Sequence, residues 1–293
     1  MCCHHARLNF CNNGRDFGKN MKKLIIISDW ASDTLTCQEI QSVVEGFVKG
    51  ENTPHITFVS SLPSTFHTGF LLSQVVETEE RYGRPANTII FQNTDLRTHT
   101  EDKLEAAEGA EFVVIKLVSG IYLCGPNAGY DFSFIKRKID EMYLYKGFAV
   151  GGQFRSRDLY ARVCAHLIEG MEQEFDLEGV HVNSIPEVRG FHVAHIDNYG
   201  NIKTTITMED FKGNYEYGGY VPVSINGFVH KARYVKTIFS EVAGTLVVAK
   251  GSSGHKDNPY LELSVRMKEN GHQKSAASLF HHPFPGDLIE IKI

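Results

Sequence analysis

KKLIIIS, residues 22–28, is the first of three short apolar runs that end in polar side chains. The other two are HITFVSS at 55–61 and NTIIFQN at 87–93. The segments between these runs, 37–50 and 66–83, carry apolar residues at helical spacing. Short strands that alternate with helices predict a mostly parallel α/β sheet.

The first half of the chain continues with a strand pair and a further helix. Residues 111–116 and 120–123 have the composition of two strands, and residues 157–175 have apolar positions at helical spacing. We therefore expect an α/β domain with a mostly parallel central sheet over residues 21–175 and a polar linker at 176–190.

The pattern changes after residue 190. Seven short runs of alternating apolar and polar residues follow, and Gly, Asn and Asp separate them. The runs are FHVAHID (191–197), KTTITM (203–208), YVPVSING (220–227), KARYVKTI (231–238), GTLVVAKG (244–251), YLELSVRM (260–267) and LIEIKI (288–293). This alternation predicts an antiparallel β-barrel domain, or a sandwich, over residues 191–293.

The composition is that of an ordinary globular protein. The 293 residues include 30 Lys+Arg against 35 Asp+Glu, which gives a net charge of −5, and 42% are hydrophobic. The length favours two domains, and the slightly acidic balance without a basic run argues against nucleic acid as a partner. Every apolar run is far shorter than the roughly 20 residues of a membrane span, so no membrane partner is expected. These exclusions favour a small polar or cationic ligand.

Cysteine usage bears on the compartment and on metal binding. Residues 1–20 lack the apolar core of a secretory signal, and we expect them to form a disordered leader. This leader contains five side chains that can bind metals: Cys2, Cys3, His4, His5 and Cys11. No second half with zinc-finger spacing follows, so no metal site is expected. Cys37, Cys124 and Cys164 lie in apolar surroundings, which favours free thiols and the cytoplasm.

Several common functional motifs are absent from the sequence. It contains no G-x-G-x-x-G after a strand, no G-K-[ST] phosphate loop, no H-E-x-x-H and no G-x-S-x-G. These absences argue against the dinucleotide-binding, NTPase, zinc protease and serine hydrolase classes.

Polar clusters follow the first and third predicted strands. In SDWASD (28–33), Asp29 comes directly after the strand, where open α/β sheets bind ligands. A carboxylate there can accept hydrogen bonds from a ribose diol, so we favour ligand binding for Asp29, whereas Asp33 could equally cap the next helix. In QNTDLRTH (92–99), nearly every side chain is polar, although Asp95 and Arg97 could also pair in a solvated loop.

Three further clusters lie later in the chain. GPNAG (125–129) is a tight turn before a predicted helix. FRSRD (154–158) stands at a helix start, where backbone N–H groups can bind an anion. IDNYGN (196–201) combines a carboxylate, an aromatic ring and an amide in one loop, although Asn198 and Gly200 also suit an ordinary β-turn.

In this order, the motifs resemble those of the S-adenosyl-L-methionine (SAM) hydroxide adenosyltransferases, or SAM hydrolases, a family that includes the fluorinase and the chlorinase. The resemblance extends over about residues 21–293, and IDNYGN and FRSRD are its most specific parts. The other matching segments are SDWASD, NTDLRTH (93–99), GPNAG, AHLIEG (165–170), GSSG (251–254) with YLEL, and AASL (276–279).

The resemblance implies substrate-binding roles for individual residues and makes residues 21–175 a nucleoside-binding domain. Asp29 corresponds to the residue that holds the ribose hydroxyls. Asp197 and Asn201 would hold the methionine end and the base, and Tyr199 would stack near adenine. The remaining substrate-binding residues that the resemblance implies are Thr98, Phe154, Ser252, Ser253 and Ala276.

The catalytic positions differ from the family pattern. Asp95 matches the family's catalytic aspartate, but Arg155 stands where the hydrolases have a histidine. Ser156 stands where the fluorinase has a halide-contacting serine and the hydrolases have glycine. Leu96 and Arg97 replace a Pro-Gly pair. Where the family has an arginine, this chain has Asp102 or Lys103 nearby, and His99 is a spare acid/base candidate.

These residues lead to a hypothesis of SAM cleavage at C5′ by water, which gives adenosine and L-methionine without a further cofactor. Two alternatives stay open, a halide-dependent synthase of 5′-halo-adenosine and a non-catalytic SAM- or adenosine-binding protein. A third, a generic α/β protein outside the family, would lack a cleft between the two halves. The resemblance also implies a homotrimer with each site between the α/β domain of one subunit and the barrel of its neighbour.

Overall fold

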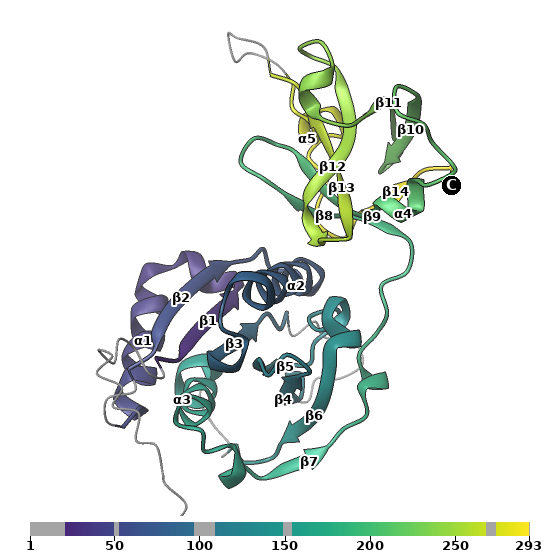
Figure 1. Cartoon of the computed structure of the whole chain (residues 1–293). Coiled ribbons are helices and arrows are strands. Elements are labelled where there is room, and N and C mark those ends of the chain that lie inside the picture. Colours follow the sequence, from purple (N-terminus) through teal and green to yellow (C-terminus); the bar gives the residue numbers. More distant parts are fainter. Residues whose placement is uncertain (1–20, 50–52, 97–108, 149–153, 268–273, 293) are drawn as a thin grey trace, which may run out of the picture.

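The chain forms a sheet flanked by helices and a separate closed barrel, which Figure 1 shows joined by the segment after β7 (Leu177–Gly179). The computed structural model describes residues 21–49, 53–96, 109–148, 154–267 and 274–292. The expected fold class, an α/β unit with a mostly parallel central sheet followed by a β-barrel, is confirmed.

The sheet is parallel on one side and antiparallel on the other. Its strands run in the order β2-β1-β3-β5-β4-β6-β7. The neighbours among β2, β1, β3 and β5 are parallel, whereas β4, β6 and β7 pair antiparallel. The strands are β1 Lys23–Ser28, β2 His55–Ser60, β3 Thr88–Asn93, β4 Phe112–Leu117, β5 Tyr122–Pro126, β6 Ile139–Tyr145 and β7 Leu177–Gly179.

Helices cover both faces of this sheet. Successive residues of β1 point to opposite faces, and both sets are apolar because both faces are buried. Helices α1 (Thr34–Phe47) and α3 (Ala161–Glu169) pack on the face of Leu24 and Ile26. Helix α2 (Thr65–Tyr82) packs on the face of Ile25 and Ile27.

Short helical turns connect these elements. The 3-10 turns are η1 Asp29–Ser32, η2 Pro85–Asn87, η3 Ser133–Lys138, η5 Glu172–Glu174 and η6 Val182–Ser184, and a further one, η7 Ile238–Ser240, lies in the barrel domain. A π-helical turn, η4 Ser156–Tyr160, precedes α3.

Two segments of this half differ from expectation. The helix expected at 157–175 begins as the π-helical turn and ends at Glu169, because Gly170 adopts a left-handed conformation with φ +71°. The stretch expected to be linker contains β7, which pairs with the edge strand β6. Three residues give too little alternation for such a short edge strand to be read from the sequence.

The barrel closes through seven strands in the order β10-β11-β12-β13-β9-β8-β14. They are β8 Phe191–Ile196, β9 Ile202–Thr207, β10 Tyr220–Ile225, β11 Phe228–Val235, β12 Leu246–His255, β13 Asn258–Val265 and β14 Leu288–Glu290, with helices α4 Met208–Phe211 and α5 Ala276–Leu279 between them. The barrel is antiparallel, as expected, except for one pair, since β11 and β12 are parallel. Alternation of apolar residues identifies strands but not their relative direction, so the sequence could not show this.

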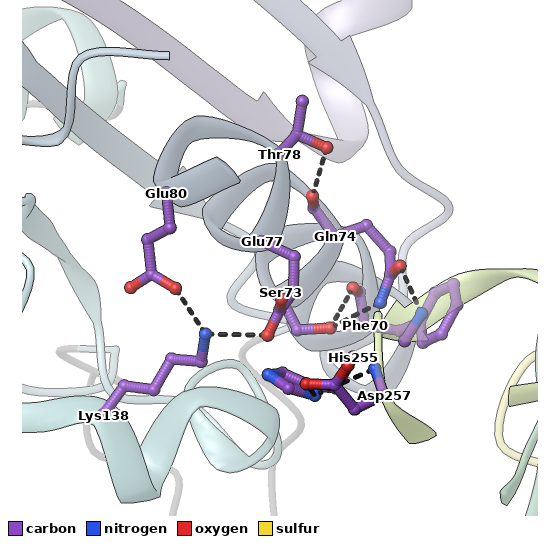
Figure 2. A network of polar contacts seen from close by, with 10 residues as sticks. Phe70, Ser73, Gln74, Glu77, Thr78, Glu80, Lys138, His255 and Asp257 are labelled. Atoms are coloured by element: carbon purple, nitrogen blue, oxygen red, sulfur yellow. Dashed lines mark hydrogen bonds and ion pairs between the residues drawn. The ribbon is translucent and has the colours of Figure 1, made fainter. Parts of the chain in front are cut away.

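Helix α2 also carries the contact between the two domains. The Gly254 N–H of the β12–β13 hairpin donates a hydrogen bond to Gln74 Oε1 at 2.9 Å. Figure 2 shows Gln74 and Phe70 facing this hairpin, while Lys138 bridges Glu77 and Glu80 nearby. Ring contacts join Phe66 to His192 at 5.1 Å and Phe70 to Tyr260 at 6.0 Å. The contact therefore extends over more than two turns of one helix.

A histidine pair completes this contact. His67 Nε2 lies 2.8 Å from His195 Nδ1, and the rings stack with their centroids 5.1 Å apart. His67 Nδ1 accepts a hydrogen bond from the Leu62 N–H at 2.9 Å, so the neutral ring carries its hydrogen on Nε2 and donates it to His195. A proton added to Nδ1 of either ring would displace an existing hydrogen bond. Burial, followed by the neighbouring His195, lowers the pKa of His67 from 6.5 to about 4.

Two further observations concern the described residues. None of the helices of the described residues is long and apolar enough to cross a membrane.

The cysteines of the described residues, Cys37, Cys124 and Cys164, carry free thiols. The Sγ atoms of the buried pair Cys124 and Cys164 lie 3.7 Å apart.

The histidine pair should make the folded state sensitive to mild acid. Because the pKa of His67 is lower in the folded chain than in the unfolded one, the unfolded chain binds more protons between pH 6.5 and about 4. The stabilisation is complete above that window and is lost as the pH falls through it. Chemical denaturation should show a loss of about 2 kcal/mol from His67 between about pH 7.5 and about pH 5.

The variant His67→Asn should remove most of this pH dependence, whereas His55→Asn, which changes an exposed histidine of β2, should keep it. An unchanged slope in His67→Asn would assign the acid sensitivity to other groups.

Candidate functional site

The carboxyl ends of the parallel strands β1 and β3 bring the first group of candidate residues together. The strands pair in register with Ser28 beside Asn93, and Ser28 Oγ donates a hydrogen bond to Asn93 O at 2.5 Å. Asp29 directly follows β1, and its Oδ1 lies 3.2 Å from Ser28 Oγ. Asp33 instead caps α1, because it accepts hydrogen bonds from the Leu35 N–H and from Thr36 Oγ1. Asp29 is therefore the strand-end carboxylate that no helix cap engages.

Buried polar side chains at the end of β3 form a hydrogen-bonded cluster, which we call the floor of the candidate site. Thr94 Oγ1 lies 2.7 Å from Thr68 Oγ1 of α2, and Thr68 Oγ1 donates a hydrogen bond to Ser61 Oγ at 3.0 Å. Gln92 Nε2 donates to Pro126 O at 2.5 Å, which ties β3 to the end of β5. Gln92 is fully buried, and its Oε1 accepts a hydrogen bond from the Thr94 N–H at 3.3 Å, so both ends of the amide have partners.

Asp95 and Arg155 approach each other at the edge of this floor. Asp95 Oδ2 accepts a hydrogen bond from the Ala110 N–H at 2.8 Å. A Cβ atom added to Gly109 would lie 2.6 Å from Asp95 Oδ2 and 3.2 Å from Arg155 Nη1. The carboxylate and the guanidinium therefore reach the same point, from the end of β3 and from the start of the π-helical turn. A side chain at position 109 would fill this point.

Ser156 and Phe154 flank Arg155 in the sequence but have different surroundings. Ser156 is buried, and its Oγ accepts a hydrogen bond from Asn93 Nδ2. Its own hydroxyl hydrogen remains a potential donor. The ring of Phe154 packs against Trp30, with the centroids 6.2 Å apart and the planes at 82°. Arg157, the second arginine of the FRSRD motif, pairs with Asp158 and Glu39.

The sequence interpretation missed Asp131. This residue lies after the GPNAG turn and is fully buried, and neither carboxylate oxygen meets the geometry of a hydrogen bond in the described part of the chain. Burial first, and then the charge of Asp95, raise the pKa of Asp131 well above its ordinary value, with a smaller contribution from Asp29, while Gln92 acts in the opposite direction. Its signal in the sequence is an acidic residue next to a tight turn, which is typical of any surface loop.

The barrel contributes the second group of candidates through the loop between β8 and β9. Asp197 Oδ1 accepts hydrogen bonds from the N–H groups of Tyr199 and Asn201 at 2.9 and 3.0 Å, and Oδ2 accepts one from Asn201 Nδ2 at 2.9 Å. The Asp197 carboxylate therefore stabilises the conformation of its own loop. Gly200, with φ +75°, permits the tight turn, and its carbonyl accepts a hydrogen bond from the Ala277 N–H at 2.9 Å.

This loop borders a cavity of about 580 Å³. Tyr199, Phe239 and Met267 stand around it with 75%, 76% and 57% of their surface exposed. The volume is in the range of small-molecule sites, and so many exposed apolar side chains are typical of an interface.

The other expected barrel residues occupy different environments. Ser252 Oγ accepts a hydrogen bond from Lys203 Nζ at 2.9 Å. Ser253 is buried, and its hydroxyl lacks a partner among the described residues. Ala276 is fully buried in the barrel core, so its methyl group packs rather than lines a surface. Thr98, Arg97, His99, Asp102 and Lys103 lie outside the described residues.

Within the described ranges, the two groups of candidates remain separate. The residues around the cavity all belong to the barrel, and none of the hydrogen bonds described above joins Asp29 or Asp95 to the 196–201 loop. No three His, Cys, Asp or Glu side chains of the described residues are placed to hold a metal ion.

Solved structures share this two-domain fold over nearly the whole chain. An uncharacterized conserved protein from Thermotoga maritima matches with a TM-score of 0.71 and 19% identity, over 92% of this chain and 100% of its own. A conserved hypothetical protein from Thermus thermophilus matches with a TM-score of 0.64 and 18% identity, over 93% and 100%. A comparison with curated proteins finds no match. These likenesses define the class as an α/β sheet domain followed by a closed barrel.

The barrel matches a known domain family. Residues 191–282 match the family model described as the SAM hydroxide adenosyltransferase C-terminal domain. This match confirms, over the barrel, the resemblance inferred from the motifs. The family description points to SAM-processing chemistry in general.

The turn at Gly200 should be intolerant of a side chain. A Cβ atom there would lie 2.4 Å from Ser275 Oγ and 2.5 Å from Ser275 Cβ, in addition to the strain of a positive φ. Gly213→Ala provides a matched control, because Gly213 has φ +81° but nothing within 4 Å of the added atom. Gly213→Ala should cost about 1–2 kcal/mol in the free energy of unfolding, and Gly200→Ala at least about 1 kcal/mol more. Equal losses would contradict the proposed clash.

Proposed function

We propose that this protein cleaves SAM at C5′ of the ribose with water as the nucleophile, giving adenosine and L-methionine. The observation that carries the proposal is the approach of Asp95 and Arg155 to one point beside the strand end that holds Asp29. The family match of the barrel domain supports SAM as the ligand of this acidic site. Asp29 is the residue we assign to the ribose hydroxyls.

The chemistry needs few protein groups because SAM is already activated. Water attacks C5′, the C5′–S bond breaks, and its electron pair returns to sulfur, so methionine leaves as a neutral thioether. Asp95 would orient the water and accept its proton, and Arg155 would stabilise the oxygen as negative charge develops. The protein supplies position and electrostatics, and the proposed reaction needs no further cofactor.

A halide as nucleophile is the second candidate. The observation in its favour is Ser156, whose Oγ accepts a hydrogen bond from Asn93 and whose hydrogen is available to an anion. The product would then be 5′-halo-adenosine instead of adenosine.

Variants of the two carboxylates should separate binding from turnover. Asp29→Ala removes both acceptors for the ribose diol, so SAM binding should weaken by about 10- to 100-fold. Asp95→Asn should bind SAM within a few-fold of the unmodified protein and lower turnover by about 100-fold or more. Calorimetry measures the first effect, and chromatography of adenosine formed from SAM measures the second.

Asp33→Asn is the matched control, because this carboxylate caps α1 next to Asp29 and asparagine can replace it as a cap. It should leave both binding and turnover unchanged. Adding chloride or fluoride tests the halide alternative through the appearance of 5′-halo-adenosine. SAM binding without any product would select a non-catalytic binding protein, and neither binding nor product would refute the proposal.

We also propose that the complete site forms between subunits of a homotrimer. The support is the separation of the two candidate groups within one chain and the exposed apolar rim of the barrel cavity around Tyr199. The Asp29 site of one subunit would then face the 196–201 loop of its neighbour.

Mixing two inactive variants should restore part of the activity. In a trimer assembled from equal amounts of Asp29→Ala and Asn201→Ala chains, about one quarter of the sites would combine an intact Asp29 with an intact Asn201 by random assortment. Adenosine formation should rise to about that fraction after the subunits are exchanged. Sites built within one chain would give no recovery, and native mass spectrometry reports the oligomeric state.

A further inference from the structure

Asp131 occupies a position that the fold holds closely. Gly69 of α2 lies against the loop that carries it, and a Cβ atom at Gly69 would be 2.3 Å from Tyr130 O and 3.1 Å from Asp131 O. The loop is also fixed by the Asp131 N–H, which donates a hydrogen bond to Ala128 O at 3.2 Å, and by the Tyr130 N–H, which donates to Thr65 Oγ1 at 3.3 Å. The carboxyl group therefore cannot move easily toward solvent.

The electrostatic surroundings of Asp131 are unusual for a buried carboxyl group. Buried carboxylates are normally paired with a cation or well hydrogen-bonded, whereas neither oxygen of Asp131 meets the geometry of a hydrogen bond among the described residues. The charges that act on it are those of Asp95 and Asp29, which are both negative, while the Gln92 amide and the backbone at Ala128 act in the opposite direction. On α2, the titratable residue nearest in sequence to Gly69 is His67, whose pKa of about 4 keeps it uncharged at neutral pH.

These surroundings favour the protonated form of Asp131 until a positively charged group binds nearby. Burial and the two neighbouring carboxylates raise the pKa of Asp131 well above its ordinary value. A cation placed between Asp29 and Asp95 would offset their charges and reverse that effect. Arg155 approaches Asp95, so it already supplies one positive charge on that side of the site. A cationic ligand held by Asp29 would supply a second.

We propose that Asp131 is a specificity-determining residue that senses the positive charge of the ligand and releases its proton when a cationic adenosyl ligand binds. The inference rests on the proposed function, because it takes the sulfonium of SAM as that charge. No bond of the ligand changes in this step. The Asp131 O–H gives its proton to solvent, and the resulting carboxylate stabilises the bound sulfonium.

The consequence is selection of SAM over its neutral relatives. S-adenosylhomocysteine has the same adenosine and amino acid parts but an uncharged thioether. Its binding therefore does not stabilise the ionised form of Asp131. Linkage between proton release and binding makes the affinity for a cation rise with pH, by at most about tenfold per pH unit. The affinity for the thioether should change much less over the same range.

Calorimetry with two ligands that resist hydrolysis tests this proposal on the full-length protein. Sinefungin, in which a protonated amine replaces the sulfonium group, is the cationic probe, and S-adenosylhomocysteine is the neutral probe. Titrations near neutral pH in two buffers with different ionisation enthalpies count the protons released. We expect up to one proton per sinefungin, and close to none per S-adenosylhomocysteine.

The variant Asp131→Asn should abolish the proton release and lower the preference for sinefungin over S-adenosylhomocysteine by about tenfold. Asp140→Asn, which changes an exposed carboxylate of β6, should preserve both. The proton count on the unmodified protein needs no variant, so a poorly folding Asp131→Asn does not remove the test.

The outcomes distinguish this inference from the proposed function. If SAM is cleaved but sinefungin binds without proton release, the role of Asp131 is refuted and the function stands. An equal proton release in Asp131→Asn also refutes that role. If neither nucleoside binds and SAM is not cleaved, both proposals fail.

Discussion

The hydrogen bond from Ser28 to the backbone of Asn93 sets the geometry on which the candidate site depends. It joins two parallel strands at their last residues, so the chain leaves both strands at one edge of the sheet. Asp29 and Asp95 are the first acidic residues after those two ends, and the register brings them to the same region. Parallel strands whose carboxyl ends share an edge create such sites in many unrelated proteins, which is why this one could be anticipated.

Carboxylates gathered in this way oppose one another, and the fold has to compensate. Arg155 approaches Asp95, the backbone N–H of Ala110 donates to the same carboxylate, and Asp131 is removed from water. Hydroxyl and amide groups of the surrounding floor are satisfied by one another and by the backbone. These contacts offset part of the negative charge of the site within the protein.

The sequence predicted the strands, the long helices and the two-domain plan because each rests on a local periodicity. It also placed Asp29 and Asp95, since both follow buried strands closely. Asp33 could not be assigned, because a helix cap and a ligand contact need the same side chain. Asp131 escaped notice because its burial depends on Gly69, a residue far earlier in the chain whose missing side chain admits the loop. The parallel pairing of β11 with β12 is likewise a long-range property.

Helix α2 serves both halves of the molecule with a single set of side chains. Phe66, His67, Phe70 and Gln74 meet the barrel, while Leu72 and Val76 belong to the sheet core and Gly69 receives the Asp131 loop. The two domains are consequently difficult to exchange independently of each other. A chimera that takes its sheet from one relative and its barrel from another would have to carry the α2 sequence that matches the barrel, yet that same segment must still fit the foreign sheet. Divergence of either half is thus tied to the other through 18 residues.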